Sequence, residues 1–174
     1  MNRDRGPLRR WIKYLVAGAL VVVVGIVLAI TLIPSEEKRV KRQFHLLSEW
    51  VSKSPEENAF TMLQKMKNIG TLFDEHCEMK IQDQSLSGSY TRQEVSTYAG
   101  SARSYLSQLD LKFYDLRIVF PEKEIARVNS TARLTGRSTA GERMDETREL
   151  ECVLRKIDKQ WLFSQIEVIE VLKK

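Results

Sequence analysis

The chain has 174 residues and a formal net charge of +5, and 43% of its residues are hydrophobic. This length suits one ordinary globular domain, and the hydrophobic content excludes wholesale disorder. Residues 1–13 contain five basic residues and one acidic residue, so the rest of the chain is close to neutral. A near-neutral body lacks the broad basic face that nucleic acids require, so we expect no nucleic-acid partner.

The first element in chain order is an uncharged stretch of nineteen residues from Leu15 to Ile33, of which thirteen are Leu, Ile or Val. A helix of this length spans about 28 Å, close to the roughly 30 Å thickness of a bilayer's hydrocarbon core. Trp11 and Tyr14 lie where interfacial aromatic residues are expected. The sequence therefore predicts a basic tail over 1–13, a transmembrane helix over 14–33 and a domain over 34–174.

The apolar stretch is typical of an uncleaved signal anchor, because it is too long for a signal peptide and no small-x-small site follows it. Basic residues flank it on both sides, but a long folded domain crosses a membrane largely regardless of charge. We therefore expect a single-pass protein of the inner (plasma) membrane with a cytoplasmic N-terminus and an extracytoplasmic domain. Gly18, Gly25 and Ala29 share one helix face, which fits either a membrane dimer or ordinary transmembrane composition.

Two amphipathic helices are expected next. The first is capped by Ser35, and its apolar positions Val40, Phe44, Leu47 and Val51 fall on one face. The segment 54–57 (Ser-Pro-Glu-Glu) predicts the second helix start, with a capping hydroxyl, a first-turn proline and a reciprocal glutamate. The expected buried stripe of this second helix consists of Ala59, Met62, Leu63, Met66, Ile69 and Phe73.

A short strand follows, in which Cys77, Met79 and Ile81 alternate with charged residues, and a polar segment over 82–90 predicts a hairpin or loop. A capping box from Thr91 to Glu94 then opens a third helix. The apolar side of this helix is expected to hold Val95, Tyr98, Ala99, Ala102, Tyr105, Leu106 and Leu109.

After residue 110 the hydrophobic period changes from 3.6 to 2, which predicts strands. The expected strands cover 111–120, 126–134, 144–157 and 161–172, with an irregularity near Asp115 and a tight turn at 158–159. The expected fold class is therefore α+β, a cone of three helices packed on a curved, mostly antiparallel sheet behind the membrane helix.

This order of elements resembles the nuclear transport factor 2-like superfamily, which includes ketosteroid isomerases and SnoaL-like cyclases. The resemblance extends to Phe73 before the first strand, to 88–94 (Gly-Ser-Tyr-Thr-Arg-Gln-Glu) and to 156–162 (Lys-Ile-Asp-Lys-Gln-Trp-Leu). It covers roughly residues 36–172 and implies the cone fold. The superfamily includes enzymes, carriers and assembly modules, so the resemblance implies no single activity.

Catalysis like that of ketosteroid isomerases needs a carboxylate base after the first strand, with a Tyr and a protonated acid deep in the cone. Asp83 lies near the first position, but its polar neighbours favour an exposed loop, and the first helix contains no Tyr. No catalytic residue is therefore assigned. His45 and His76 lack partners at metal-ligand spacing, so we expect no metal or other cofactor.

Glu146 and Arg148 share the strand parity of the apolar Leu150, so an unbroken register points both charges into the opening of the cone. In the alternative, a bulge before Leu150 or a sheet that runs past the helices leaves both charges in water. Together with Tyr98 and Tyr105 of the third helix, they are the candidate pocket residues.

Two cysteines, Cys77 and Cys152, both fall on the apolar parity of their strands. In an oxidising compartment they could form a disulfide, but two buried free thiols fit the pattern as well.

We expect a non-catalytic extracytoplasmic module of the cell envelope, which contacts an envelope protein partner or a second copy of itself. The alternative is a small-molecule-binding or isomerase-like protein with an apolar ligand in the cone. An enclosed apolar cavity with convergent polar groups favours the alternative, whereas a filled cone favours the first hypothesis.

Overall fold

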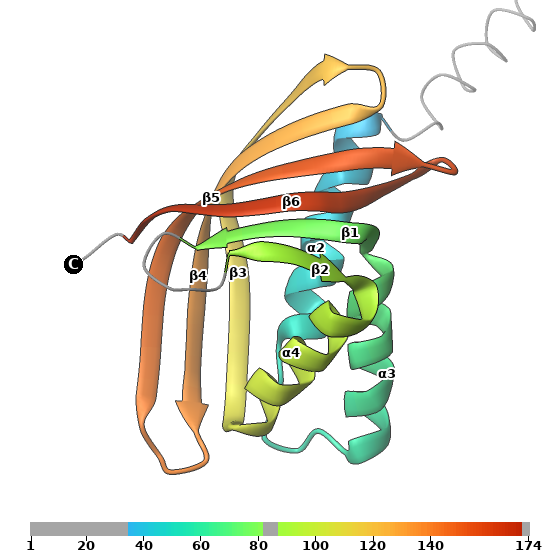
Figure 1. Cartoon of the computed structure of the whole chain (residues 1–174). Coiled ribbons are helices and arrows are strands. Elements are labelled where there is room, and N and C mark those ends of the chain that lie inside the picture. Colours follow the sequence, from blue (N-terminus) through green and yellow to red (C-terminus); the bar gives the residue numbers. More distant parts are fainter. Residues whose placement is uncertain (1–34, 82–86, 172–174) are drawn as a thin grey trace, which may run out of the picture. The chain divides into compact units, whose positions relative to one another are not determined.

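Helices come first and long strands afterwards in the computed structural model, which describes residues 35–81 and 87–171 (Figure 1). The α+β class predicted above is confirmed. In chain order the elements are α2 (Glu36–Val51), α3 (Ala59–Thr71), β1 (Phe73–Ile81), β2 (Gly88–Thr91), α4 (Arg92–Ser104), β3 (Leu106–Glu122), β4 (Ile125–Ser138), β5 (Arg143–Ile157) and β6 (Gln160–Val171).

All six strands form one sheet in the order β2-β1-β6-β5-β4-β3. Neighbouring strands run antiparallel, except for the parallel pair of β1 and β6. The long strands bend strongly, and the three helices lie against one side of the bent sheet (Figure 1). The expected curved, mostly antiparallel sheet is therefore present.

Backbone irregularities lie where the sequence predicts them. Asp115 has a positive φ of 54°, and the pairing of β3 with β4 shifts register between Tyr114 and Arg117. Asp158 and Lys159 have φ values of 48° and 67° in the turn between β5 and β6. Two positive φ values fit the twist of a two-residue hairpin turn, so the expected tight turn is confirmed.

The core lies between α2 and the concave side of the sheet. Val40, Phe44 and Leu47 of α2 are buried, as the predicted stripe requires. The Phe44 ring meets Phe113 of β3 and Phe163 of β6 edge to face, with centroids 5.1 and 5.0 Å apart. Aromatic pairs in this geometry add to the energy of burial, so α2 is firmly attached to the sheet.

The predicted start of the second helix is wrong by four residues. The structure begins α3 at Ala59, and the side chain of Asn58 accepts a hydrogen bond of 2.8 Å from the Thr61 amide. Glu57, expected to complete a capping box, instead points its carboxylate into the interior. Two members of the predicted buried stripe, Ala59 and Leu63, are exposed.

The third helix begins as predicted, since Thr91 and Glu94 form a capping box. It ends earlier than predicted, at Ser104, and Leu106 and Leu109 belong to β3. Leu106 and Leu109 pair with Ser138 and Gly136 of β4, and the amides of Lys53 and Leu109 also donate to each other's carbonyls over 2.7 and 3.0 Å.

None of the helices in the described residues is long and apolar enough to cross a membrane. The predicted tail over 1–13 and the predicted span over 14–33 lie outside the described residues.

Candidate ligand site

An open apolar cavity of about 510 Å³ lies between α4 and the concave side of the sheet. Helices α2, α3 and α4 line it together with five of the six strands, all except β4. The lining residues are Leu47, Val51, Ile69, Phe73, Met79, Ile81, Tyr90, Val95, Tyr98, Ala99, Ala102, Leu111, Phe113, Leu150 and Ile166. The cone is therefore not filled by its own side chains, as the small-molecule hypothesis requires, but the cavity is open rather than enclosed.

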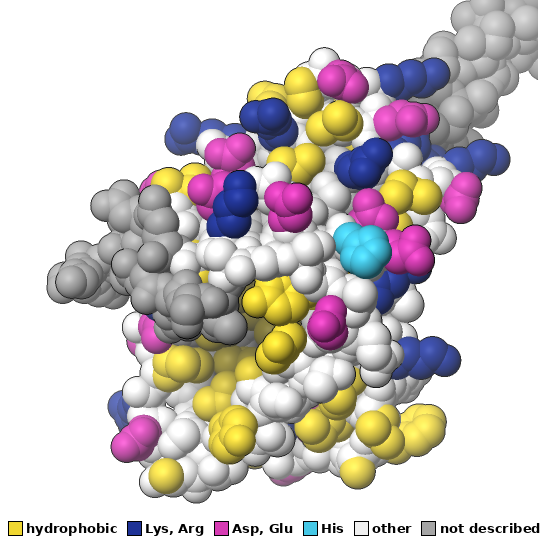
Figure 2. Space-filling model, viewed as in Figure 1, with side chains coloured by type: hydrophobic (Ala, Val, Ile, Leu, Met, Phe, Trp, Pro, Cys, Tyr) yellow, Lys and Arg dark blue, Asp and Glu magenta, His cyan; other side chains and the backbone are white. Residues whose placement is uncertain are grey.

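The polar groups on this lining are the hydroxyls of Tyr90 and Tyr98. The two rings meet edge to face with centroids 5.6 Å apart, and Tyr98 is 57% exposed. This exposure places the tyrosine pair at the rim of the cavity. Hydrophobic side chains gather around a hollow on this face of the molecule (Figure 2). A ligand would thus meet hydroxyl groups at the opening and only apolar side chains further in.

The structure separates the four predicted pocket residues. Tyr98 lines the cavity, whereas Tyr105 caps the end of α4, is 73% exposed and is absent from the lining. Glu146 and Arg148 are also absent from the lining and form an ion pair of 2.8 Å with each other. Their side chains are 45% and 25% exposed, so this pair meets water at the part of β5 that lies beyond the cavity.

A register shift in the pairing of β5 with β6 falls between Glu149 and Leu150. The extra residue of this shift is Ile169 on β6, whereas β5 pairs with β4 without a shift from Arg143 to Arg155. The parity that Glu146 and Arg148 share with Leu150 is therefore unbroken, and Leu150 lines the cavity. The two charges lie outside the cavity lining and meet solvent, as in the alternative in which the sheet runs past the helices.

The cysteines, histidines and aspartate that the sequence analysis considered are placed as follows. Cys77 and Cys152 are both buried free thiols. Burial raises the pKa of the Cys77 thiol to about 12, helped by Asp74 and Glu78, and burial also raises the pKa of Cys152. His45 and His76 are exposed, and the described part of the chain holds no cluster that could bind a metal ion. Asp83 lies outside the described residues.

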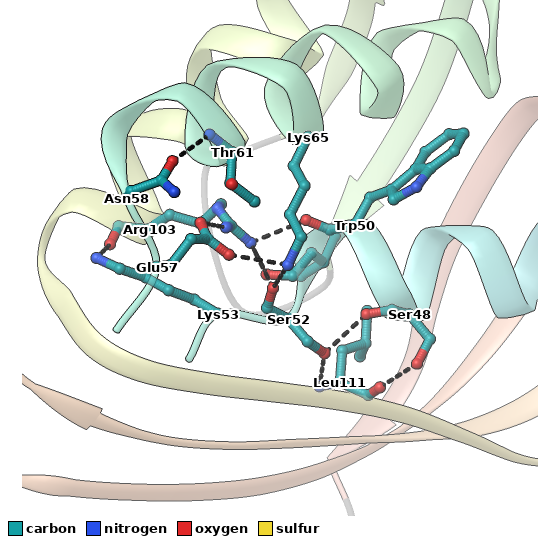
Figure 3. Close-up of polar contacts among 11 residues, drawn as sticks. Ser48, Trp50, Ser52, Lys53, Glu57, Asn58, Thr61, Lys65, Arg103 and Leu111 are labelled. Atoms are coloured by element: carbon teal, nitrogen blue, oxygen red, sulfur yellow. Dashed lines mark hydrogen bonds and ion pairs between the residues drawn. The ribbon is translucent and has the colours of Figure 1, made fainter. Parts of the chain in front are cut away.

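A buried ion pair that the sequence prediction did not include lies at the ends of α2 and α4 (Figure 3). Arg103 in the last turn of α4 is 1% exposed, and its guanidinium pairs with the carboxylate of Glu57, whose side chain is 2% exposed. The same guanidinium donates to the carbonyl oxygens of Trp50, Val51 and Ser52 at the end of α2. A cation at this position satisfies carbonyls that a helix terminus leaves unpaired.

Two lysines extend this ion pair into a network (Figure 3). Lys65 of α3 donates to Glu57 over 2.8 Å and to the Ser52 carbonyl over 2.9 Å. Lys53 donates to the carbonyls of Arg103 and Leu106, over 2.9 and 2.7 Å, at the end of α4. One carboxylate and three cations thus join the ends of α2 and α4 to the start of α3. The network fixes the helix that carries Val95, Tyr98, Ala99 and Ala102 of the cavity wall.

The electrostatics of Glu57 follow from this network. Burial by itself raises the pKa of the Glu57 carboxyl, but the hydrogen bonds from Lys65 and Arg103, with their charges, outweigh it and hold the pKa below its ordinary value. A signal for Arg103 does exist in the sequence, since it lies four and eight residues after Ala99 and Val95 on their helix face. Nothing local indicates its partner, because Glu57 lies 46 residues away.

Known structures share this architecture. A protein assigned as a scytalone dehydratase of Novosphingobium aromaticivorans DSM 12444 matches with a TM-score of 0.61 and 18% identity, over 79% of this chain and 85% of its own. The LinA-type3 hexachlorocyclohexane dehydrochlorinase of Novosphingobium barchaimii LL02 matches with a TM-score of 0.63 and 8% identity, over 80% and 88%. A cystatin-like protein of unknown function from Nostoc punctiforme PCC 73102 matches with a TM-score of 0.56 and 10% identity, over 78% and 90%.

No family model and no curated protein matches this sequence. The structural matches establish the fold alone, because their sequence identities are low. The described domain shares the α+β fold of these structures, with three helices on a curved sheet as the resemblance in the sequence implied.

Proposed function

We propose that this protein is a membrane-anchored binding protein that holds a small, neutral, mainly apolar molecule in its cone without transforming it. The observation that carries the proposal is the cavity of about 510 Å³, whose lining is apolar apart from two tyrosine hydroxyls. Pockets for small molecules are typically of this size, with hydrophobic walls and a few polar groups that orient the ligand.

The charge of the ligand follows from the lining. A charged group inside an apolar cavity loses its hydration without compensation, which is strongly unfavourable. The cavity walls in the described residues carry no carboxylate, ammonium, guanidinium or imidazole group. We therefore expect the inserted part of the ligand to be neutral, with any hydrogen-bonding group placed near Tyr90 and Tyr98.

The proposal includes the location of the domain. The uncharged run over 14–33 supports a membrane anchor, and the basic tail over 1–13 supports a cytoplasmic N-terminus. The domain from residue 34 would then sample apolar molecules outside the cytoplasm, close to the inner (plasma) membrane.

The experiment uses the full chain in detergent micelles, with 1-fluoronaphthalene as the apolar probe and ¹⁹F NMR as the readout. A substitution that fills the cavity, Ala99→Phe, is compared with the wild type in identical micelles. Partition of the probe into detergent is the same in both samples, so a resonance present only in the wild type reports the cavity. We expect that resonance in the wild type and its loss in Ala99→Phe.

The matched control is Ser101→Phe, which adds the same ring to an exposed position on the same helix, outside the lining. This variant should keep the bound resonance. Circular dichroism establishes that both variants fold. If folded Ala99→Phe binds the probe as the wild type does, the cavity is not the binding site and the proposal fails.

A further inference from the structure

Helices α3 and α4 form an antiparallel pair. Gly70 of α3 packs against Ser96 of α4, and Gly100 of α4 packs against Met66 of α3, so closely that an added methyl group would clash at either glycine. Because residue numbers rise on one helix as they fall on the other, the start of α3 lies beside the end of α4.

Four large hydrophobic side chains are exposed on these two helices. Phe60 and Leu63 of α3 are 76% and 65% exposed, and Tyr98 and Tyr105 of α4 are 57% and 73% exposed. Spacings of three and seven residues place each pair on one side of its helix. Between the two pairs runs a row of exposed small hydroxyl residues, Thr97, Ser101 and Ser104. We call these seven residues the α3–α4 face.

This face carries almost no charge. Residues 58–64 include no charged residue, and residues 95–105 include only Arg103, which is buried. Glu94 and Lys67 lie at its border. In the space-filling view, hydrophobic and uncharged side chains predominate at the lower right, with a few charged side chains among them, whereas charged side chains crowd the upper part (Figure 2). Aromatic enrichment with depletion of charge is typical of the centre of a protein–protein interface.

We infer that the α3–α4 face binds the same face of a second copy of this chain. A two-fold axis brings identical residues together, and here it does so without opposing like charges. A groove of about 340 Å³ between the helices offers space for a side chain such as Phe60 of the other copy. Leu63, Met66 and Thr97 line it, with Lys67 and Arg92 as its charged residues.

The size of the face indicates the strength of this dimer. Two helices of 13 residues each are about 20 Å long and about 10 Å wide, which gives a projected area on the order of 400 Å². A standard interface buries about 800 Å² of accessible surface on each partner, so the dimer should be weak in dilute solution. Confinement of the full chain to one bilayer raises its local concentration and favours pairing. The face shares Tyr98 with the cavity rim. Its pairing in a bilayer rests on the membrane anchor proposed above and does not require a ligand in the cavity.

The test uses the full chain reconstituted in phospholipid vesicles and oxidised with copper phenanthroline. A single cysteine is introduced at the centre of the face, Ser101→Cys, or on the far side of the sheet, Asn129→Cys; both positions are exposed, and the native cysteines are buried. We expect a disulfide-linked dimer from Ser101→Cys and about tenfold less from Asn129→Cys. Adding Phe60→Ser to Ser101→Cys should lower the yield about tenfold, since aromatic anchors dominate such interfaces.

The matched control for Phe60→Ser is Val119→Ser, because Val119 is 59% exposed on β3. It should leave the Ser101→Cys yield unchanged. Three outcomes overturn the inference. Equal yields at positions 101 and 129 indicate collision without a defined interface. A dimer insensitive to Phe60→Ser indicates pairing through another segment such as 15–33. If the purified chain forms no disulfide-linked dimer, the α3–α4 face binds a different protein instead of a second copy.

Discussion

The buried pair of Glu57 and Arg103 allows a sharp test of how the cone is held together. Glu57→Gln keeps the size of the side chain but removes its charge, which leaves the Arg103 guanidinium, 1% exposed, without a counter-charge. Breaking a buried ion pair by removing one partner costs about 3–5 kcal/mol. Lys65 is 23% exposed and can turn towards solvent. We therefore expect the free energy of unfolding to fall by about 3 kcal/mol, the lower end of that range.

The assay is urea unfolding of the full chain in detergent solution, followed by circular dichroism. The same change can be followed by heating the protein. For a protein of this size each kcal/mol lowers Tm by about 2–4 °C, so Tm of Glu57→Gln should fall by about 6–12 °C. The matched control is Glu56→Gln, because Glu56 is the exposed neighbour in the same turn; surface substitutions of this kind change stability by less than about 0.5 kcal/mol. Equal stability of the two variants would refute the role assigned to the network.

The pH dependence of the protein's stability provides a second test of the role of Glu57. The pKa of Glu57 is lower in the folded protein than its ordinary value, so the folded state favours the charged carboxylate. The stabilisation is complete above the ordinary pKa of 4.5 and is lost as the pH falls through the lower folded value. Glu57→Gln should therefore flatten the decline of stability below about pH 4.5. If the stability of Glu57→Gln declined at acidic pH as steeply as that of the wild type, the role assigned to the Glu57 carboxylate would be contradicted.

Two further predictions concern the compartment and the thiols. A C-terminal fusion to alkaline phosphatase, which is active only after export, should be active, whereas fluorescence of a cytosolic reporter at that terminus would reverse the proposed topology. Burial raises the pKa of both thiols, that of Cys77 to about 12, so neither should react with Ellman's reagent at pH 8 until the protein is unfolded. Rapid labelling of the native protein would show that the strands carrying Cys77 and Cys152 open readily.

Local patterns in the sequence were sufficient for most elements of the fold. The capping box at Thr91 and Glu94, the irregularity at Asp115 and the turn at 158–159 depend on residues close together in the chain, and the structure confirms all three. The start of α3 could not be predicted in this way. The position of this start depends on Arg103 at the end of α4, which pairs with the Glu57 side chain in the interior.

The site was harder to predict than the fold. Hydrophobic periodicity places Tyr98 and Tyr105 on one side of α4, but it does not distinguish a side that packs in a core from one at a cavity rim or a protein surface. The cavity itself depends on how completely apolar side chains from three helices and five strands fill the space between them. No single stretch of the sequence therefore predicts the volume of the cavity.

The parallel pairing of β1 with β6 has a consequence for assembly. The last strand in the chain, β6, lies between β1 and β5. It therefore joins the hairpin of β1 and β2 to the meander of β3, β4 and β5. Until β6 is in place, these two parts share no strand pairing, and Phe73, which pairs with Phe163 of β6, has no ladder partner. Closure of the cone thus waits for a contact between segments about 90 residues apart, which favours slow folding with late formation of the binding cavity.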